Sequence, residues 1–239
     1  LNKIRVLLAK FLIPRAACLR VVSERIKKSL LQTKSYKPQA KVWVLPIFVD
    51  INKIKNAPIK TNLRRKYPRF DFIILMASRL TAEKNIGLAV EATAEAIKDY
   101  PKTGLIIIGN GPEQKNLKFQ ISNLKINENI IMEDWTDDLA SYYKTADLFL
   151  LTSNYEGYGR TIIEAVVSGC GVISSKVGIA DEILLKENIF EVGNKEQLKE
   201  KIIKAVRGEL KMPNADYLAK MSTKEEYLRA YKTSWENCG

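Results

Sequence analysis

The chain has 239 residues, 46% of them apolar, which is enough for one large domain or two small ones with a sizeable buried core. Its net charge of +12 is unevenly placed, because residues 1–70 hold 18 Lys and Arg against two acidic residues, a balance of +16. Three cysteines without close spacing and the lack of histidine argue against a disulfide framework and against a metal site, and they make a reducing compartment such as the cytoplasm the default.

Residues 1–70 are predicted to form a short mixed segment. A helix is expected at 3–12, a strand at 18–23, a second helix at 24–33 and extended chain at 41–50. The stretch 52–68 is rich in Asn, Lys and Pro and is predicted to be a linker. This segment is too short for a core of its own.

The basicity of residues 1–70 has three explanations that the sequence leaves open. The charges can be solvated, or they can attract an anionic lipid surface or another polyanionic partner. The opening residues 1–18 also have the basic start and apolar run of a secretory or lipoprotein signal, but Lys10 and Arg15 interrupt that run. No stretch approaches the roughly eighteen apolar residues of a membrane-spanning helix. We therefore expect a cytoplasmic protein with at most peripheral contact with the inner face of a membrane, and no nucleic-acid partner.

From Asp71 onward short apolar runs alternate with amphipathic stretches of helical length. The predicted strands are 72–78, 104–109, 129–133, 147–153, 171–175 and 188–192. The predicted helices between and after them are 85–100, 112–124, 138–145, 160–169, 180–185 and 195–208. Two more helices are predicted within 214–238, the second capped by Ser222 or Thr223 with Glu225 or Glu226. Strict alternation of strand and helix predicts a doubly wound α/β domain with a parallel sheet.

Four loops that follow the predicted strands suggest a ligand site. In an open parallel sheet ligands bind outside the carboxyl ends of the strands, so these loops are expected to meet. Gly109, Gly111, Gly157 and Gly159 permit tight turns and close approach of a ligand, although each alone is more simply a turn residue. Together they bring two helix N-termini, near Pro112 and Gly159, to one crevice, where amide groups and the helix dipole favour an anion.

Charged side chains in the same loops indicate the class of ligand. Lys84 and Arg160 add the positive charge that a diphosphate needs, the alternative for Lys84 being an exposed lysine at a helix start. Glu156 ends a strand and Glu164 lies about one turn into the next helix, so both carboxylates can face the crevice. Carboxylates beside an anion site are explained if they hydrogen-bond hydroxyl groups, as a ribose and a sugar offer. The pattern suggests a nucleotide sugar.

At these residues the chain resembles the carboxy-terminal half of a GT-B glycosyltransferase, in particular of the large retaining family 4. The similarity covers about residues 70–210 and keeps the order of the family's features. These features are SRLTAEKN at 78–85, GNGPE at 109–113, Trp135 followed by Asp137, ADLFLLTSNYEGYG at 146–159, the glutamate pair, the run 164–184, and NKEQLKEKI at 194–202.

The resemblance implies roles for individual residues. Arg79, Lys84 and Glu156 match the catalytic positions: the two cations bind the donor diphosphate and Glu156 contacts the transferred sugar. In the rest of the implied donor site, Glu164 holds the ribose, Trp135 and Thr136 flank the base, Gly109 and Gly111 shape the neighbouring loop, and the amides of Tyr158, Gly159, Arg160 and Thr161 meet the phosphates. Such enzymes retain the anomeric configuration and need neither a bound metal nor a cofactor besides the donor.

This chain departs from the family's pattern at two places. The residue after the EGFG step is often apolar or proline in the family, whereas here Arg160 is charged, which is expected to alter sugar choice or add a phosphate contact. Near the domain junction the family commonly shows PNGVD, whereas this chain has PIFVD at 46–50.

The resemblance also implies a partner domain that binds the acceptor, of which residues 1–45 resemble only the last helix, strand and helix. We therefore interpret 1–50 as a remnant of that acceptor domain, 51–213 as the Rossmann-like nucleotide-sugar domain and 214–239 as helices that cross back. The predicted function is the donor-binding portion of a hexosyltransferase that acts on a glycan or lipid-linked acceptor. Two alternatives are a nucleotide-binding or regulatory module without transfer, and an epimerase acting on nucleotide sugars.

Overall fold

The structure is a computed structural model and describes residues 2–33, 40–212 and 223–238. The chain divides into two compact units. The small unit is Leu1–Asp50 with Lys220–Gly239, and the large unit is Ile51–Ala219.

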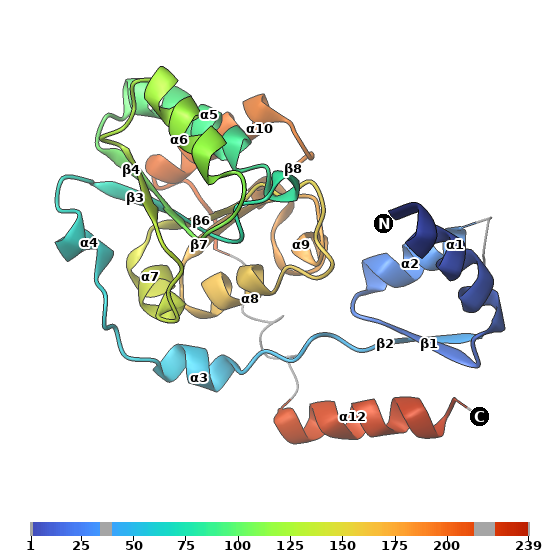
Figure 1. Ribbon diagram of the computed structural model, residues 1–239. Coiled ribbons are helices and arrows are strands. Elements are labelled where there is room, and N and C mark those ends of the chain that lie inside the picture. The colour runs from blue at the N-terminus through green and yellow to red at the C-terminus, as the bar shows by residue number, and fades with distance from the viewer. Residues whose placement is uncertain (1, 34–39, 213–222, 239) are drawn as a thin grey trace. The chain divides into compact units, whose positions relative to one another are not determined.

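The large unit is built on a six-stranded parallel sheet (Figure 1). Its strands are β3 (Phe72–Ala77), β4 (Thr103–Ile108), β5 (Ile130–Glu133), β6 (Leu148–Leu151), β7 (Gly171–Ser175) and β8 (Ile189–Phe190). The strand order is β5-β4-β3-β6-β7-β8, and every neighbouring pair is parallel. The predicted doubly wound α/β fold is confirmed, and each predicted strand forms within a few residues of its expected place.

Helices cover both faces of this sheet (Figure 1). On one face lie α5 (Ile86–Asp99), α6 (Gln114–Asn123) and α10 (Lys195–Val206). On the other face lie α7 (Leu139–Thr145) and α8 (Arg160–Val167), while the short α9 (Ala180–Ile183) follows β7. Two single 3-10 turns, η2 (Ala82–Lys84) and η3 (Lys186–Asn188), complete the connections.

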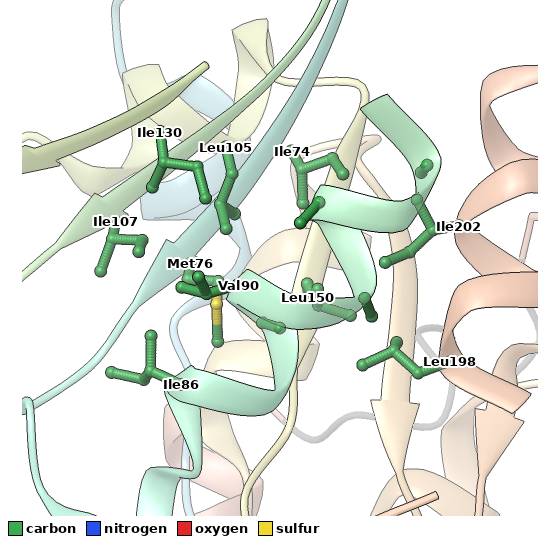
Figure 2. Close-up of a cluster of buried hydrophobic side chains, with 14 of the residues drawn as sticks. Ile74, Met76, Ile86, Val90, Leu105, Ile107, Ile130, Leu150, Leu198 and Ile202 are labelled. Atoms are coloured by element: carbon green, nitrogen blue, oxygen red, sulfur yellow. The ribbon is translucent and has the colours of Figure 1, made fainter. Parts of the chain in front are cut away.

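The main hydrophobic core lies between the sheet and the helices α5, α6 and α10 (Figure 2). Ile74 of β3 and Ile107 of β4 point to this face and meet Val90 of α5 and Ile202 of α10. The residues between them in the strands, such as Leu75, are fully buried as well, because helices cover the opposite face too. This two-sided burial explains why the strands read as almost unbroken apolar runs in the sequence.

The stretch 52–68, predicted to be a linker, contains two short helices instead. They are α3 (Ile51–Asn56) and α4 (Leu63–Lys66). Asn62 caps α4 by accepting a hydrogen bond from the Arg65 N–H at 3.1 Å, and the buried Leu63 donates its N–H to Thr145 Oγ1 at 3.2 Å. The linker prediction is wrong here because a single apolar anchor and a cap outweigh a composition rich in Lys, Asn and Pro.

A hydrogen-bonded cluster fastens α4 to the end of β5. The Glu133 carboxylate accepts hydrogen bonds from Lys66 Nζ at 2.6 Å, the Tyr67 hydroxyl at 2.5 Å and the Tyr142 hydroxyl at 2.8 Å. Burial alone would raise the pKa of Glu133, but these three donors outweigh it and hold that pKa below its ordinary value. Burial and the bond to Glu133 raise the pKa of Tyr67 to about 12. The cluster fixes the strand end from which the loop with Trp135 departs.

The small unit holds a two-stranded parallel sheet of β1 (Cys18–Val21) and β2 (Lys41–Val44). Its helices are α1 (Asn2–Leu12), the 3-10 turn η1 (Ile13–Arg15), α2 (Glu24–Gln32) and α12 (Lys224–Glu236). The predicted cap of α12 is confirmed as a capping box of Thr223 and Glu226, whereas the helix predicted before it lies outside the described residues. Among the described residues of this unit, Val49 is the one buried hydrophobic side chain. No helix in the described ranges is long and apolar enough to cross a membrane.

Cys18 and Cys238 form a disulfide within the small unit. Their Cα atoms lie 5.3 Å apart, a separation that suits such a bridge. The sequence argument against a disulfide is wrong for this pair, because a spacing of 220 residues along the chain does not measure distance in the fold. The third cysteine, Cys170, is free and buried, and this burial raises the pKa of its thiol.

Candidate functional site

The strand order of the large sheet reverses at its middle, between β3 and β6. From β3 the chain continues through β4 to β5 on one side, and from β6 through β7 to β8 on the other. The two central strands are neighbours, with Leu75 of β3 beside Phe149 of β6. Where the strand order reverses in this way, the loops after the central strands diverge and leave a crevice at their carboxyl ends.

A cavity of about 330 Å³ lies at this point, and we call it the switch-point cavity. Its floor is formed by the ends of β3 and β6, and its rim by the loops that follow them and by the start of α8. Of the predicted site residues, those that line it are Arg79, Lys84, Trp135, Glu156, Tyr158, Gly159, Arg160 and Thr161. The others, Gly109, Gly111, Thr136 and Glu164, are not among its lining residues.

Three polar residues that line the cavity are not among the predicted site residues. Ser78 directly follows β3, and Thr152 and Ser153 directly follow β6. Their place after a strand end, with a hydroxyl group, is the signal that could have identified them. Each offers a hydrogen-bonding group at the rim of the switch-point cavity.

Lys84 and Glu156 form an ion pair at the cavity. Lys84 Nζ lies 2.6 Å from Glu156 Oε1, and the two side chains are only 17% and 15% exposed. The Ser153 hydroxyl donates to the same carboxylate at 2.7 Å. Because this pair is largely shielded from water, its charges interact more strongly than those of a surface pair.

Among the described residues, no group of three His, Cys, Asp or Glu is placed to hold a metal ion.

The loop after β6 also fixes the segment that carries Lys84. The Thr152 hydroxyl lies within hydrogen-bonding distance of the Lys84 and Asn85 carbonyl oxygens, at 2.9 and 3.0 Å. The Asn154 N–H donates to the Glu83 carbonyl at 2.8 Å. Asn85 has a φ of 47°, a left-handed conformation that asparagine tolerates better than most residues. The position of the Lys84 ammonium therefore depends on the loop after β6.

The cation Arg79 is held much more loosely. Its guanidinium lies 4.0 Å from the Glu83 carboxylate, and its side chain is largely exposed.

Gly109 and Gly111, in the loop after β4, lie against the loop after β3 that carries Arg79. A Cβ on Gly109 would lie 1.9 Å from the Ser78 carbonyl oxygen, and one on Gly111 would meet the Leu80 carbonyl oxygen at 2.3 Å. The two glycines thus permit the loops after β3 and β4 to pass closely.

The start of α8 forms the remaining wall of the switch-point cavity. Its N-cap, Gly159, has a φ of 92° and provides no side-chain cap. Arg160, the first residue of the helix, donates from Nε to Glu164 Oε1 at 2.7 Å. Uncapped amide groups at a helix start, together with the helix dipole, favour an anion at this wall.

Gly178, after β7, supports this wall and was not among the predicted site residues. It has a φ of +55°, and a Cβ there would lie 2.2 Å from the Tyr158 carbonyl oxygen. The same carbonyl accepts the Ile179 N–H at 2.8 Å. Only glycine permits this close approach without strain, so the backbone around Tyr158 requires a glycine at position 178.

The two residues predicted to flank a base differ in position. Trp135 is about half exposed at the rim of the cavity. The Thr136 hydroxyl accepts the Asp138 N–H at 3.1 Å, so it serves the turn that leads into α7. An aromatic ring at the rim can stack on a planar ligand.

Comparison with known proteins places the chain in a family. Residues 60–224 match the family described as Glycosyl transferases group 1. The alpha-monoglucosyldiacylglycerol synthase of Streptococcus pneumoniae is 32% identical over 147 residues, which make up 58% of this chain and 33% of the synthase. The poly(glycerol-phosphate) alpha-glucosyltransferase of Bacillus subtilis is 29% identical over 146 residues, 59% of this chain and 22% of that protein. The chain therefore spans a third or less of the length of these relatives.

Solved structures agree with this placement. The Anabaena protein HepE in complex with UDP and glucose has a TM-score of 0.84 at 22% identity, and the match covers 99% of this chain and 68% of HepE. In its complex with UDP, the TM-score is 0.72 at 25% identity, with 82% of this chain and 56% of HepE covered. The resemblance to the carboxy-terminal half of GT-B enzymes is confirmed, and the chain belongs to the glycosyl transferases group 1 family.

Proposed function

We propose that the large unit is the donor-binding half of a retaining glycosyltransferase, which moves a sugar from a nucleoside-diphosphate sugar to a glycan or lipid-linked acceptor. The observation that carries this proposal is the meeting of Lys84, Arg160 and the start of α8 with Glu156 at the switch-point cavity. The cations and the helix start suit a diphosphate, while a carboxylate suits sugar hydroxyl groups. Family membership supplies the class of reaction.

We propose UDP as the nucleotide of the donor. HepE was solved with UDP, and several relatives from streptococci are named as UDP-N-acetylglucosamine transferases acting on peptide. The acceptors named for relatives differ widely, from peptide to a diphosphoundecaprenol-linked sugar. The proposed acceptor class is therefore kept as broad as a glycan or a lipid-linked molecule.

The proposed roles of the lining residues follow from the groups that meet at the cavity, whereas those of Glu164 and Thr136, which do not line it, rest on the family resemblance. Arg79, Lys84 and the amides of 158–161 bind the diphosphate, Glu156 contacts the transferred sugar, and Glu164 holds the ribose. Trp135 stacks on the base, with Thr136 beside it. During transfer, negative charge grows on the departing diphosphate, and cations already in place stabilise that charge without reorganising.

We propose that residues 51–213 bind the donor and that residues 1–50 and 214–239 belong to the part of the protein that binds the acceptor.

The alternative function, from a different class, is a nucleotide-binding module that transfers no sugar. The position of Glu156 favours transfer over that alternative, because Ser153 and Lys84 hold its carboxylate at the cavity, where a module that binds only a nucleotide would not need it.

Calorimetric titration of the 239-residue chain with UDP, GDP, ADP and UDP-sugars tests the proposal. We expect saturable binding of UDP and tighter binding of at least one UDP-sugar. Glu156→Gln should keep or raise the affinity for UDP, because it removes a negative charge and releases Lys84 from the ion pair. It should lose the extra affinity for the UDP-sugar, because the sugar contact changes. If none of the nucleotides binds up to millimolar concentration, the proposal is refuted.

We also propose that the small unit contacts the inner face of an anionic membrane. Its helix α1 exposes Ile4, Leu7 and Phe11, and residues 1–50 of this unit hold 11 Lys and Arg against two acidic residues, a balance of +9. An exposed apolar helix face within a basic segment suits the interface of an anionic bilayer, where apolar burial and charge attraction add together.

Sedimentation with liposomes measures this contact. Binding should rise with the fraction of anionic lipid and fall with salt, because charges are screened over about 8 Å at physiological ionic strength. Phe11→Glu should weaken binding more than Leu31→Glu, which makes the same charge change at an exposed leucine of α2. Equal binding to neutral and anionic vesicles would rule the contact out.

A further inference from the structure

Arg160 carries its positive charge at an energetically unfavourable position. It is the first residue of α8, and its side chain is 63% exposed and lines the switch-point cavity. A positive charge at a helix N-terminus opposes the helix dipole. In an i,i+4 pair, a base that precedes its acid is also the less favourable order. Local helix energetics therefore do not account for Arg160.

Two other helices also begin with a cation, Lys195 of α10 and Lys224 of α12, but a side-chain cap and acidic residues of the first turn offset its charge there. The helix α10 is capped by Asn194 and carries Glu196 in its first turn, and α12 is capped by Thr223 and carries Glu225 and Glu226. By contrast, α8 has neither a side-chain cap nor an acidic residue in its first turn. A residue that breaks a local rule beside a cavity indicates a ligand that compensates for it. At the start of α8 that ligand is an anion.

Arg160 also forms an ion pair with Glu164. Glu164 is only 14% exposed and does not line the cavity, but Arg160 does, and the Nε–Oε1 distance between them is 2.7 Å. The neighbouring Tyr143 stays a neutral phenol, because burial, with Glu164 nearby, raises the pKa of Tyr143 well above its ordinary value. A tyrosine carries no positive charge in either protonation state, so it does not neutralise Glu164. Among the described residues, Arg160 is the cation that pairs with Glu164.

We propose that Arg160 couples recognition of the ribose to recognition of the diphosphate. Its Nε holds the Glu164 carboxylate in place for the ribose hydroxyls, and its terminal nitrogens contact the diphosphate in the switch-point cavity. A guanidinium can do both, since it offers five N–H donors in a rigid fork and the bond to Glu164 uses one of them. Arg160 is thus a positioning residue for Glu164 and a ligand of the phosphates. This inference rests on the proposed function.

Two probes separate the parts of this proposal. UDP carries both the ribose hydroxyls and the diphosphate, and 2′,3′-dideoxy-UDP carries only the diphosphate. We expect the unmodified chain to prefer UDP by about tenfold or more, the effect of one hydrogen bond to a charged group. Arg160→Gln should lower the affinity for UDP by about tenfold or more and also reduce this preference, toward the value of Glu164→Gln. Arg160→Lys should recover part of the affinity for UDP, because the charge remains, but not the preference.

The control variant is Arg207→Gln. Arg207 is exposed, donates to the Tyr100 hydroxyl at 2.7 Å and lies near the amino end of β4, away from the cavity at the carboxyl ends. Both affinities should be unchanged in this variant. Thermal unfolding followed by circular dichroism identifies any variant that fails to fold.

The outcomes distinguish this inference from the proposed function. If Arg160→Gln lowers the affinity for UDP and leaves the preference over 2′,3′-dideoxy-UDP unchanged, Arg160 contacts phosphate alone and the coupling is refuted. If neither quantity changes, the whole inference is refuted. Failure of the unmodified chain to bind UDP would instead overturn the proposed function, and this measurement needs no variant.

Discussion

Replacement of Lys84 with alanine is expected to lower the affinity for UDP by about 10- to 150-fold, the range for one lost hydrogen bond to a charged group. The affinity for uridine should change little, because the Lys84 ammonium is assigned to the diphosphate. Loss of the ammonium also removes the cation that pairs with the mostly buried Glu156 carboxylate, which keeps its hydrogen bond from the Ser153 hydroxyl. Repulsion between that carboxylate and the diphosphate adds to the loss.

Two variants decide whether Lys84 acts on the ligand or only on Glu156. Glu156→Gln breaks the same ion pair from the other side, and it should leave the affinity for UDP equal or higher, because it removes a negative charge. Lys118→Ala, at an exposed lysine of α6, serves as the matched control for lost charge. Equal losses of UDP affinity in Lys84→Ala and Glu156→Gln would show that the ion pair is structural and that Lys84 is not a phosphate ligand.

The sheet could be predicted from the sequence because its strands are buried on both faces. The runs at Phe72–Ala77 and Leu148–Leu151 are apolar throughout, and polar or glycine-containing loops mark where each strand ends. Chain order then places all loops after strands at one edge of a parallel sheet. For this reason the sequence alone predicts that Lys84, Glu156 and Arg160 meet around one crevice, and all three line the switch-point cavity.

Features that depend on distant parts of the chain could not be predicted in this way. The anchoring of Leu63 depends on a hydroxyl group 82 residues further on, and the bridge between Cys18 and Cys238 spans 220 residues. Local composition says nothing about either contact. The place of Glu164 outside the lining of the cavity likewise depends on how α8 is oriented against the sheet, which spacing alone leaves open.

Gly178→Ala is expected to have the second large effect, on both stability and ligand binding. The substitution forces an alanine to adopt a φ of +55° and places its Cβ 2.2 Å from the Tyr158 carbonyl oxygen and 3.2 Å from the Glu156 Cβ. A left-handed conformation costs a residue other than glycine about 1–2 kcal/mol, and overpacking a tight site adds about 1–3 kcal/mol. Relief of the clash must move the backbone of Tyr158 and Gly159, which forms one wall of the switch-point cavity.

Gly208→Ala is the matched control, because it introduces the same conformational strain without a clash. Gly208 follows α10 with a φ of +76°, and a Cβ there would have no neighbour within 4 Å. Urea unfolding should therefore show a small loss of unfolding free energy for Gly208→Ala and a larger one for Gly178→Ala, and calorimetry should show weakened UDP binding only for Gly178→Ala. Equal losses of stability with unchanged UDP binding would mean that the loop at Gly178 does not support the wall of the cavity. In that case the anion site at the start of α8 would depend on the helix alone.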